Sequence, residues 1–138
     1  TIDELYNILK ERVDVFVVEQ KCPYPECDGR DKSSYHMYAK DENGEIIAYL
    51  RIPLPGISYE EISIGRVLVR KDYRGRGLGR EMLINAINFI ESELDENVIR
   101  IEAQEYLISF YKSLGFVQVS KVFLEDNIPH VEMLYSGL

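Results

Sequence analysis

Hydrophobic residues recur every three or four positions at the start of the chain, a spacing that predicts an amphipathic helix. The pattern begins at Thr1 and runs on towards Glu19. Pro23 and Pro25 then exclude a helix, because proline lacks the N–H that a helix interior needs. We therefore expect residues 20 to 34 to form an irregular loop.

Apolar runs in the first half of the chain predict three strands. The first two are Tyr35–Lys40 and Glu45–Leu54, and the Asn43-Gly44 pair between them is typical of a hairpin turn. The third run, Ile62–Arg70, leads directly into a segment that carries three glycines. The first half is therefore expected to hold a hairpin and one further strand.

Helices and strands alternate in the second half. One face of a helix is apolar from Leu78 to Leu94, and a short apolar strand follows at Val98–Ala103. The remaining predicted elements are a helix at Leu107–Leu114 closed by Gly115, and strands at Phe116–Phe123 and Val131–Tyr135. This order predicts a single α/β domain over residues 1–138, with a mixed sheet and helices on both faces.

Composition and charge narrow the range of partners. The chain has 138 residues, 46% of them hydrophobic, which suffices for a core without disulfides or metals. Its formal charge of −8 disfavours nucleic acid, and no apolar run approaches the roughly 20 residues of a membrane span. We expect a cytoplasmic protein that binds neither nucleic acid nor membrane. Five cations nevertheless lie within a short stretch, a patch that suits a small phosphorylated ligand: Arg70, Lys71, Arg74, Arg76 and Arg80.

Cysteines offer little support for a metal site. The chain contains Cys22 and Cys27, with no second pair at zinc-binding spacing. A site built with His36 is the one metal candidate, whereas two free thiols or one small disulfide is the simpler interpretation. We predict no metal.

The segment Arg74-Gly75-Arg76-Gly77-Leu78-Gly79 lies between a predicted strand and a predicted helix. Backbone N–H groups in this arrangement can converge on an anion, and the absence of Cβ atoms lets phosphates approach. The dinucleotide motif needs a third glycine where Arg80 stands, and the P-loop lysine is absent. The segment therefore predicts a diphosphate site of another kind, and a glycine-rich turn with solvated arginines is the alternative.

Two blocks of sequence resemble the GNAT superfamily of N-acetyltransferases. Val67-Leu68-Val69 followed by Arg74-x-x-Gly77-x-Gly79 resembles its acetyl-CoA signature, and the segment 110–116 resembles its tyrosine-bearing helix. Further segments resemble the ElaA-like branch: Arg12, Val15–Gln20, Cys22-Pro23-Tyr24, Asp28-Gly29, Asp31, His36 and Leu124–His130. One feature departs from the family pattern, since the superfamily normally has a strand before the first helix. That strand either precedes Thr1 or is absent, which leaves the sheet edge open.

The resemblance implies an acetyl-CoA-dependent N-acetyltransferase with a mostly antiparallel sheet. Its central strand pair would splay around the pantetheine arm, and the N–H of Val67 would bind the thioester carbonyl. The residues it implies for the cofactor are Val67, Leu68, Val69, Arg74, Gly75, Arg76, Gly77, Leu78, Gly79, Arg80 and Gln104. Lys71 or Arg70 is a further candidate for an adenosine phosphate.

The catalytic residues are less clearly indicated than the residues for the cofactor. The resemblance implies that Tyr111 protonates the departing thiolate, with helix packing as its alternative role. His36 and His130 are the candidates for the base, in competition with acidic residues or water: Glu19, Glu26, Asp28 and Glu61. The acidic loop of Glu26, Asp28 and Asp31 would suit a cationic acceptor, although a solvated turn is the simpler interpretation and the one that we favour.

Two other functions stay open at this point. A catalytically idle acetyl-CoA-binding or regulatory domain would keep the glycine segment without turnover, and a related acyltransferase would use a longer acyl donor. The acceptor is a small-molecule or peptide amine of unspecified kind. The sequence does not fix the oligomeric state, and a homodimer is compatible with it.

Overall fold

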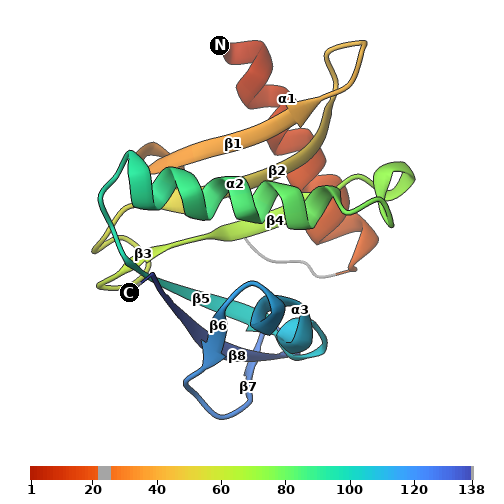
Figure 1. The fold of residues 1–138 in the computed structure, drawn as a ribbon. Coiled ribbons are helices and arrows are strands. Elements are labelled where there is room, and N and C mark those ends of the chain that lie inside the picture. The colour runs from red at the N-terminus through yellow and green to blue at the C-terminus, as the bar shows by residue number, and fades with distance from the viewer. Residues whose placement is uncertain (22–25, 138) are drawn as a thin grey trace.

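The strands form two sheets, seen in a computed structural model that describes residues 1–21 and 26–137 (Figure 1). The first sheet has the order β1-β2-β4 and is antiparallel throughout. Its strands are β1 (Ser34–Lys40), β2 (Ile46–Pro53) and β4 (Gly65–Val69). The turn between β1 and β2 is the predicted one, with Gly44 at φ 80° and the Asp41 side chain accepting from the N–H groups of Asn43 and Glu45.

The second sheet has the order β3-β5-β8-β6, and β7 also pairs with β8. Only β3 and β5 are parallel among these described pairs. Its strands are β3 (Ile62–Ser63), β5 (Val98–Gln104), β6 (Phe116–Gln118), β7 (Phe123–Glu125) and β8 (Ile128–Ser136). The predicted mixed, mostly antiparallel architecture is confirmed.

Helices cover both faces of the first sheet, with α1 behind it and α2 in front in Figure 1. The helices are α1 (Ile2–Arg12), α2 (Leu78–Ser92) and α3 (Ile108–Ser113), and shorter helical turns occur at η1 (Val13–Glu19), η2 (Asp31–Ser33), η3 (Lys71–Tyr73) and η4 (Glu105–Leu107). A capping box between Thr1 and Glu4 fixes the start of α1. The predicted first helix does reach Glu19, but its last part, η1, is wound as a π-helix.

The apolar side chains of β2 divide between two cores. Leu50 and Ile52 belong to the larger core with residues of α2, whereas Tyr49 packs with Ile8 and Val15 of the first helical segment. β2 is buried on both sides for this reason, which explains why its sequence is almost continuously apolar.

The single strand predicted at Ile62–Arg70 is wrong. The chain breaks there into β3, which pairs with β5, and β4, which pairs with β2. Arg66 has a left-handed backbone (φ 51°) at the start of β4, which turns the chain from one sheet to the other. β4 and β5 then diverge towards their carboxyl ends (Figure 1), as expected for the splayed central pair.

The strand predicted at Phe116–Phe123 is also wrong, because it forms two short strands, β6 and β7. Between them Ser120 uses its side chain to accept from the N–H of Glu132, and such local bonds compete with a regular ladder. Asp126 and Asn127, both at positive φ, close a hairpin between β7 and β8. β8 consequently begins at Ile128 instead of Val131. Among the described residues, no helix is long and apolar enough to cross a membrane.

Candidate functional site

The glycine segment lies between β4 and α2, as the order of a predicted strand and a predicted helix around it indicated. Gly75 (φ 78°) and Gly77 (φ 75°) are left-handed, and a Cβ on either would meet no atom within 4 Å. Gly77 is the N-cap of α2 and, in the described structure, no side chain caps that end. The first N–H groups of α2 therefore face the space that these glycines leave open.

Gly79 differs from the other two glycines of the segment. Its backbone is not left-handed, and an added Cβ would lie 3.5 Å from Cγ2 of Val69. An added Cβ would make an ordinary van der Waals contact with Val69, so neither the backbone conformation nor the packing against β4 requires glycine at this position.

Arg74 is turned away from the open side of the loop. Its Nε donates to the carbonyl of Val69 (2.7 Å), and its two terminal nitrogens donate to the carboxylate of Glu19 (2.8 and 3.0 Å). These hydrogen bonds lower the pKa of Glu19. The side chain of Arg74 therefore fastens the loop to the end of η1.

The other cations of the patch fall into two groups. Arg70 is bound to Asp72 and Glu45, so its charge is already compensated. Arg76 lies 5.2 Å from the ring centre of Tyr73, and Arg80 donates to the Ser113 hydroxyl (2.7 Å). Within the described residues no carboxylate pairs with Arg76, Arg80 or Lys71, so these three supply the positive charge beside the glycines.

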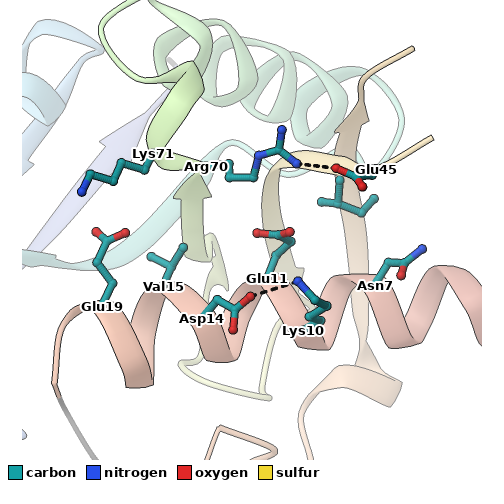
Figure 2. Close-up of a pocket in the computed structure, with 10 residues that line it drawn as sticks. Asn7, Lys10, Glu11, Asp14, Val15, Glu19, Glu45, Arg70 and Lys71 are labelled. Atoms are coloured by element: carbon teal, nitrogen blue, oxygen red, sulfur yellow. Dashed lines mark hydrogen bonds and ion pairs between the residues drawn. The ribbon is translucent and has the colours of Figure 1, made fainter. Parts of the chain in front are cut away.

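A cavity of about 360 Å³ lies on the other side of the loop, between the first helical segment and the ends of β2 and β4 (Figure 2). Its lining carries three cations and four carboxylates: Lys10, Arg70, Lys71, Glu11, Asp14, Glu19 and Glu45. Lys10 is paired with Asp14, and Arg70 with Glu45. Since four carboxylates line the cavity with three cations, it has no excess positive charge to attract a phosphate.

Tyr111 lies in α3 and is 8% exposed, packed edge-on against Phe110 and Phe116. Burial, with a smaller contribution from Tyr106, raises its pKa to about 12. The phenol therefore keeps its proton across the physiological range. The Arg80–Ser113 hydrogen bond ties this helix to the first turn of α2, so Tyr111 and the glycine segment are held by neighbouring elements.

Both ring nitrogens of His36 are engaged inside the protein. Nε2 lies 2.9 Å from the carbonyl oxygen of Asp31, and Nδ1 is hydrogen-bonded to the hydroxyl of Tyr49. A carbonyl can only accept, so Nε2 carries a hydrogen and the neutral ring uses its lone pair towards Tyr49. His36 thus has no lone pair left to act as a base.

His130 has the opposite arrangement. Its Nδ1 lies 2.7 Å from the carbonyl of Ile128, which fixes the hydrogen on Nδ1, and its ring stacks on Phe123. Among the described residues no hydrogen bond is made to Nε2, and the ring is half-buried. This tautomer can accept a proton.

Gln104, at the carboxyl end of β5, is the register partner of His130 on β8, so these two residues lie side by side in the second sheet. Val67 lies on β4 of the first sheet, beyond the break at which the chain leaves β3. β4 diverges from β5 towards the carboxyl ends of both strands (Figure 1).

The direction of the β4 peptide groups separates Val67 and Val69 from Leu68. The N–H of Arg70 bonds to Ile47 of β2, and successive N–H groups along a strand alternate in direction. The N–H groups of Val67 and Val69 therefore point to the β5 side. Leu68 is 3% exposed and packs in the core beneath α1, so its side chain is structural.

Three arginines and three carboxylates gather between α1, β2, β4 and the loop before β1. We call this group the arginine–carboxylate cluster: Arg12, Arg51, Arg66, Glu26, Asp28 and Asp31. Arg12 is fully buried and donates to Glu26 and Asp31, while Arg51, 3% exposed, donates to Asp28 and Asp31. The carboxylates of this loop are therefore bound to arginines, although Asp28 and Asp31 remain 20% and 21% exposed.

The cluster shifts the pKa of two of its members, Asp28 and Asp31. Burial acts to raise the pKa of Asp28, but hydrogen bonds from Arg51 and from the N–H of Arg30 outweigh it, so the pKa lies well below its ordinary value. Asp31 behaves alike, because Arg12 and Arg51 overcome its burial and lower its pKa. Both groups are held ionised as members of a compensated set.

No group of three or more metal-ligating side chains occurs within residues 1–21 and 26–137. Cys27 is an exposed free thiol, and Cys22, the other cysteine of the metal candidate, lies outside the described residues. His36 is committed to the bonds described above.

The sequence analysis missed Arg51 and Arg66 as members of the site region. Arg51 interrupts an otherwise apolar run in β2, and a charge at a position that must be buried is a signal for a buried ion pair. Arg66 carries no comparable signal, because a left-handed arginine cannot be read from residue type.

The sequence matches the family described as "Acetyltransferase (GNAT) domain" over residues 7–136. It is 41% identical over 133 residues to the UPF0039 protein C11D3.02c of Schizosaccharomyces pombe, an alignment that covers 96% of this chain and 87% of that relative.

Solved structures agree in fold over almost the whole chain. An acyl-CoA N-acyltransferase from Pseudomonas aeruginosa is 40% identical with a TM-score of 0.92, and ElaA from Escherichia coli is 34% identical with a TM-score of 0.90. Each comparison covers 99% of this chain and 92% of the other.

Proposed function

This chain is an acyl-CoA N-acyltransferase of the acetyltransferase (GNAT) family, ElaA-like branch, and we propose that it transfers the acetyl group of acetyl-CoA to a primary amine by direct attack in a ternary complex. The observation that carries the proposal is the uncapped start of α2 behind two left-handed glycines. This cradle follows a strand that diverges from its neighbour. The two features together suit a ligand with a diphosphate and a narrow arm.

The diphosphate would sit on the N–H groups of the loop and of the first turn of α2, from Gly75 to Arg80. The side chains of Arg76 and Arg80 would add charge, whereas Arg74 would contribute by holding the loop in place. Lys71 is the better candidate for an adenosine phosphate, because Arg70 is already paired with two carboxylates.

The pantetheine arm would enter between β4 and β5. The N–H groups of Val67 and Val69 point to that side and would bond to it, and Gln104 stands at the carboxyl end of β5. The arm would bring the thioester carbonyl to the N–H of Val67. An N–H at that point stabilises the oxyanion as the amine attacks.

The reaction needs one base and one acid. The amine nitrogen forms a bond to the carbonyl carbon while its proton passes to a base, and the C–S bond then breaks with its electron pair on sulfur. Tyr111 would protonate that thiolate, a role that a phenol with a pKa of about 12 can fill because it is still protonated at neutral pH. His130 is the base that we favour over His36, because its Nε2 lone pair is available.

A free-thiol assay tests this function. Purified protein is mixed with acetyl-CoA and a panel of amines, and release of coenzyme A above hydrolysis is measured for each. We expect release with at least one primary amine, and absence of release across the panel, with acetyl-CoA bound, would instead support an idle binding domain. Replacing acetyl-CoA by butyryl-CoA and octanoyl-CoA in the same assay tests the donor, since a preference for octanoyl-CoA would contradict the acetyl assignment.

A further inference from the structure

Arg66 lies at a β-bulge next to Val67, the residue whose N–H we assign to the thioester carbonyl. Tyr49 pairs with Leu68 and Arg51 pairs with Gly65, so the single residue between them on β2, Leu50, faces both Arg66 and Val67 on β4. A bulge of this kind bends its strand and redirects the next peptide group. The direction of the Val67 N–H therefore depends on how Arg66 is held.

The backbone of Arg66 is unfavourable for its residue type. Its φ of 51° lies in the left-handed region, which residues with a Cβ rarely adopt and which glycine adopts readily. Such a conformation persists when the surroundings fix it, and it often occurs beside functional groups.

The surroundings that fix Arg66 are the other members of the arginine–carboxylate cluster. Its Nε lies 3.1 Å from the Glu26 carboxylate and its Nη2 lies 3.5 Å from that of Asp28. Glu26 also accepts a hydrogen bond from Arg12 of α1, and Asp28 also accepts one from Arg51 of β2. The Arg66 guanidinium is thus paired with two carboxylates that also bind a helix and the neighbouring strand.

We propose that Arg66 and its partners Glu26 and Asp28 are positioning residues that fix the β4 bulge and so aim the N–H of Val67 at the thioester carbonyl. The inference rests on the proposed function, because it assumes that an acyl-CoA thioester lies at Val67. An oxyanion donor acts most strongly in the transition state, so a misdirected N–H lowers kcat more than it weakens acetyl-CoA binding.

Arg66→Ala is the central variant, because it removes the ion pairs and keeps the Cβ that opposes φ 51°. We expect kcat to fall ~30-fold, somewhat less than the ~100-fold that full loss of an oxyanion donor costs, while the Kd for acetyl-CoA stays within about threefold because the glycine segment is intact. Arg66→Gly removes the same ion pairs and permits the left-handed backbone. It should recover at least about threefold in kcat over Arg66→Ala, since glycine carries no Cβ penalty there.

Arg100→Ala is the matched control. Arg100 is 24% exposed against 21% for Arg66, it also pairs with two carboxylates, Glu61 and Glu132, and it lies on β5 away from the bulge. We expect a similar loss of Tm with kcat close to the wild-type value. Equal losses of kcat in Arg66→Ala and Arg100→Ala, or no advantage of glycine over alanine at position 66, would overturn the proposal.

A binding measurement keeps the test independent of turnover. In the ¹⁵N–¹H spectrum, the Val67 amide should shift on addition of acetyl-CoA, and the shift should be lost in Arg66→Ala and kept in Arg100→Ala. If Arg66→Ala does not fold, Glu26→Gln is used in its place in both measurements, because it weakens one of the same ion pairs. A wild-type protein that shows the Val67 shift but releases no thiol contradicts the proposed function alone, whereas a Val67 amide unmoved by acetyl-CoA contradicts the positioning role.

Discussion

His130 and His36 differ in what their second ring nitrogen meets. Each ring has one nitrogen bonded to a backbone carbonyl. The other nitrogen of His36 is hydrogen-bonded to the Tyr49 hydroxyl, whereas the other nitrogen of His130 makes no hydrogen bond among the described residues. We therefore expect His130→Gln to lower kcat about 100-fold, the usual contribution of a general base. The acetyl-CoA Kd should be unchanged, because the ring is not part of the glycine segment.

His36→Gln is the companion variant in that experiment. It should lower Tm, because it breaks two hydrogen bonds of a half-buried ring, while steady-state kcat with the best amine of the panel falls by less than about threefold. The assignment of His130 as the base is wrong if His36→Gln lowers kcat more than His130→Gln does.

Tyr111 supports a prediction about pH. Since burial raises its pKa to about 12, the phenol stays protonated, and hence able to donate, from neutral pH up to about pH 10. Loss of the proton above that range would lower kcat, so no fall of kcat is expected below pH 10. Tyr111→Phe should lower kcat about 100-fold at every pH in this range, measured by thiol release at saturating acetyl-CoA. A wild-type kcat that declines near pH 9, and a variant that shows no such decline, would contradict the assignment.

The glycine segment shows how an element's function depends on its backbone. Gly77→Glu adds a carboxylate where we place the diphosphate, and it also strains a residue at φ 75°. We expect the Kd for acetyl-CoA, measured by calorimetry, to rise at least about 100-fold, because a like charge and a side chain would occupy the anion site. The strain alone has to be separated from this effect.

Gly56→Glu provides that separation. Gly56 has a φ of 88°, and no atom lies within 4 Å of an added Cβ. Glutamate at this position therefore adds the same charge and a comparable backbone strain. It follows β2, at the opposite end of the strands from the glycine segment. Both variants should lose Tm alike, and only Gly77→Glu should lose binding; a similar loss of binding in the two would refute our placement of the diphosphate.

The same elements show what a sequence can predict. Periodicity located α2 and β5 closely, because both follow one regular spacing against a continuous core. Periodicity failed at Ile62–Arg70, because the residues of this segment have similar β propensity and predict one strand. The left-handed backbone of Arg66 instead separates β3 and β4, which pair in different sheets. Motif spacing predicted a loop between a strand and a helix at Gly75 and Gly77, but the partners of Arg74 and of His36 depend on residues distant in the chain. Tertiary contacts of this kind leave no local pattern.

Across the whole molecule the charge is distributed unevenly. The chain carries a formal charge of −8, yet the six members of the arginine–carboxylate cluster cancel one another in the interior. The cluster joins α1, β2, β4 and the loop before β1, so it links the elements on one side of the first sheet. Its ionisation should therefore affect the stability of the entire domain and not only of the loop.

Acid should weaken the domain through this cluster. The folded-state pKa of Asp28 lies below its ordinary value of 3.8, so its contribution to stability is fully present above that value. That contribution is lost as the pH falls towards the folded pKa, because the unfolded chain then binds the proton first. The free energy of unfolding should accordingly fall from about pH 5 down to pH 2.

Asp28→Asn isolates the contribution of one carboxylate. At pH 7 the variant should be less stable by about 2 kcal/mol, since it leaves Arg51 and Arg66 with one charged partner fewer in a mostly buried site. At pH 2.5 the difference from wild type should be smaller, because the unfolded wild-type chain then binds a proton at Asp28 and the ionised folded carboxylate contributes less to stability. Urea unfolding followed by circular dichroism at the two pH values measures both differences. A gap between wild type and variant that stays the same, or widens, on acidification would mean that Asp28 does not stabilise the fold through its charge.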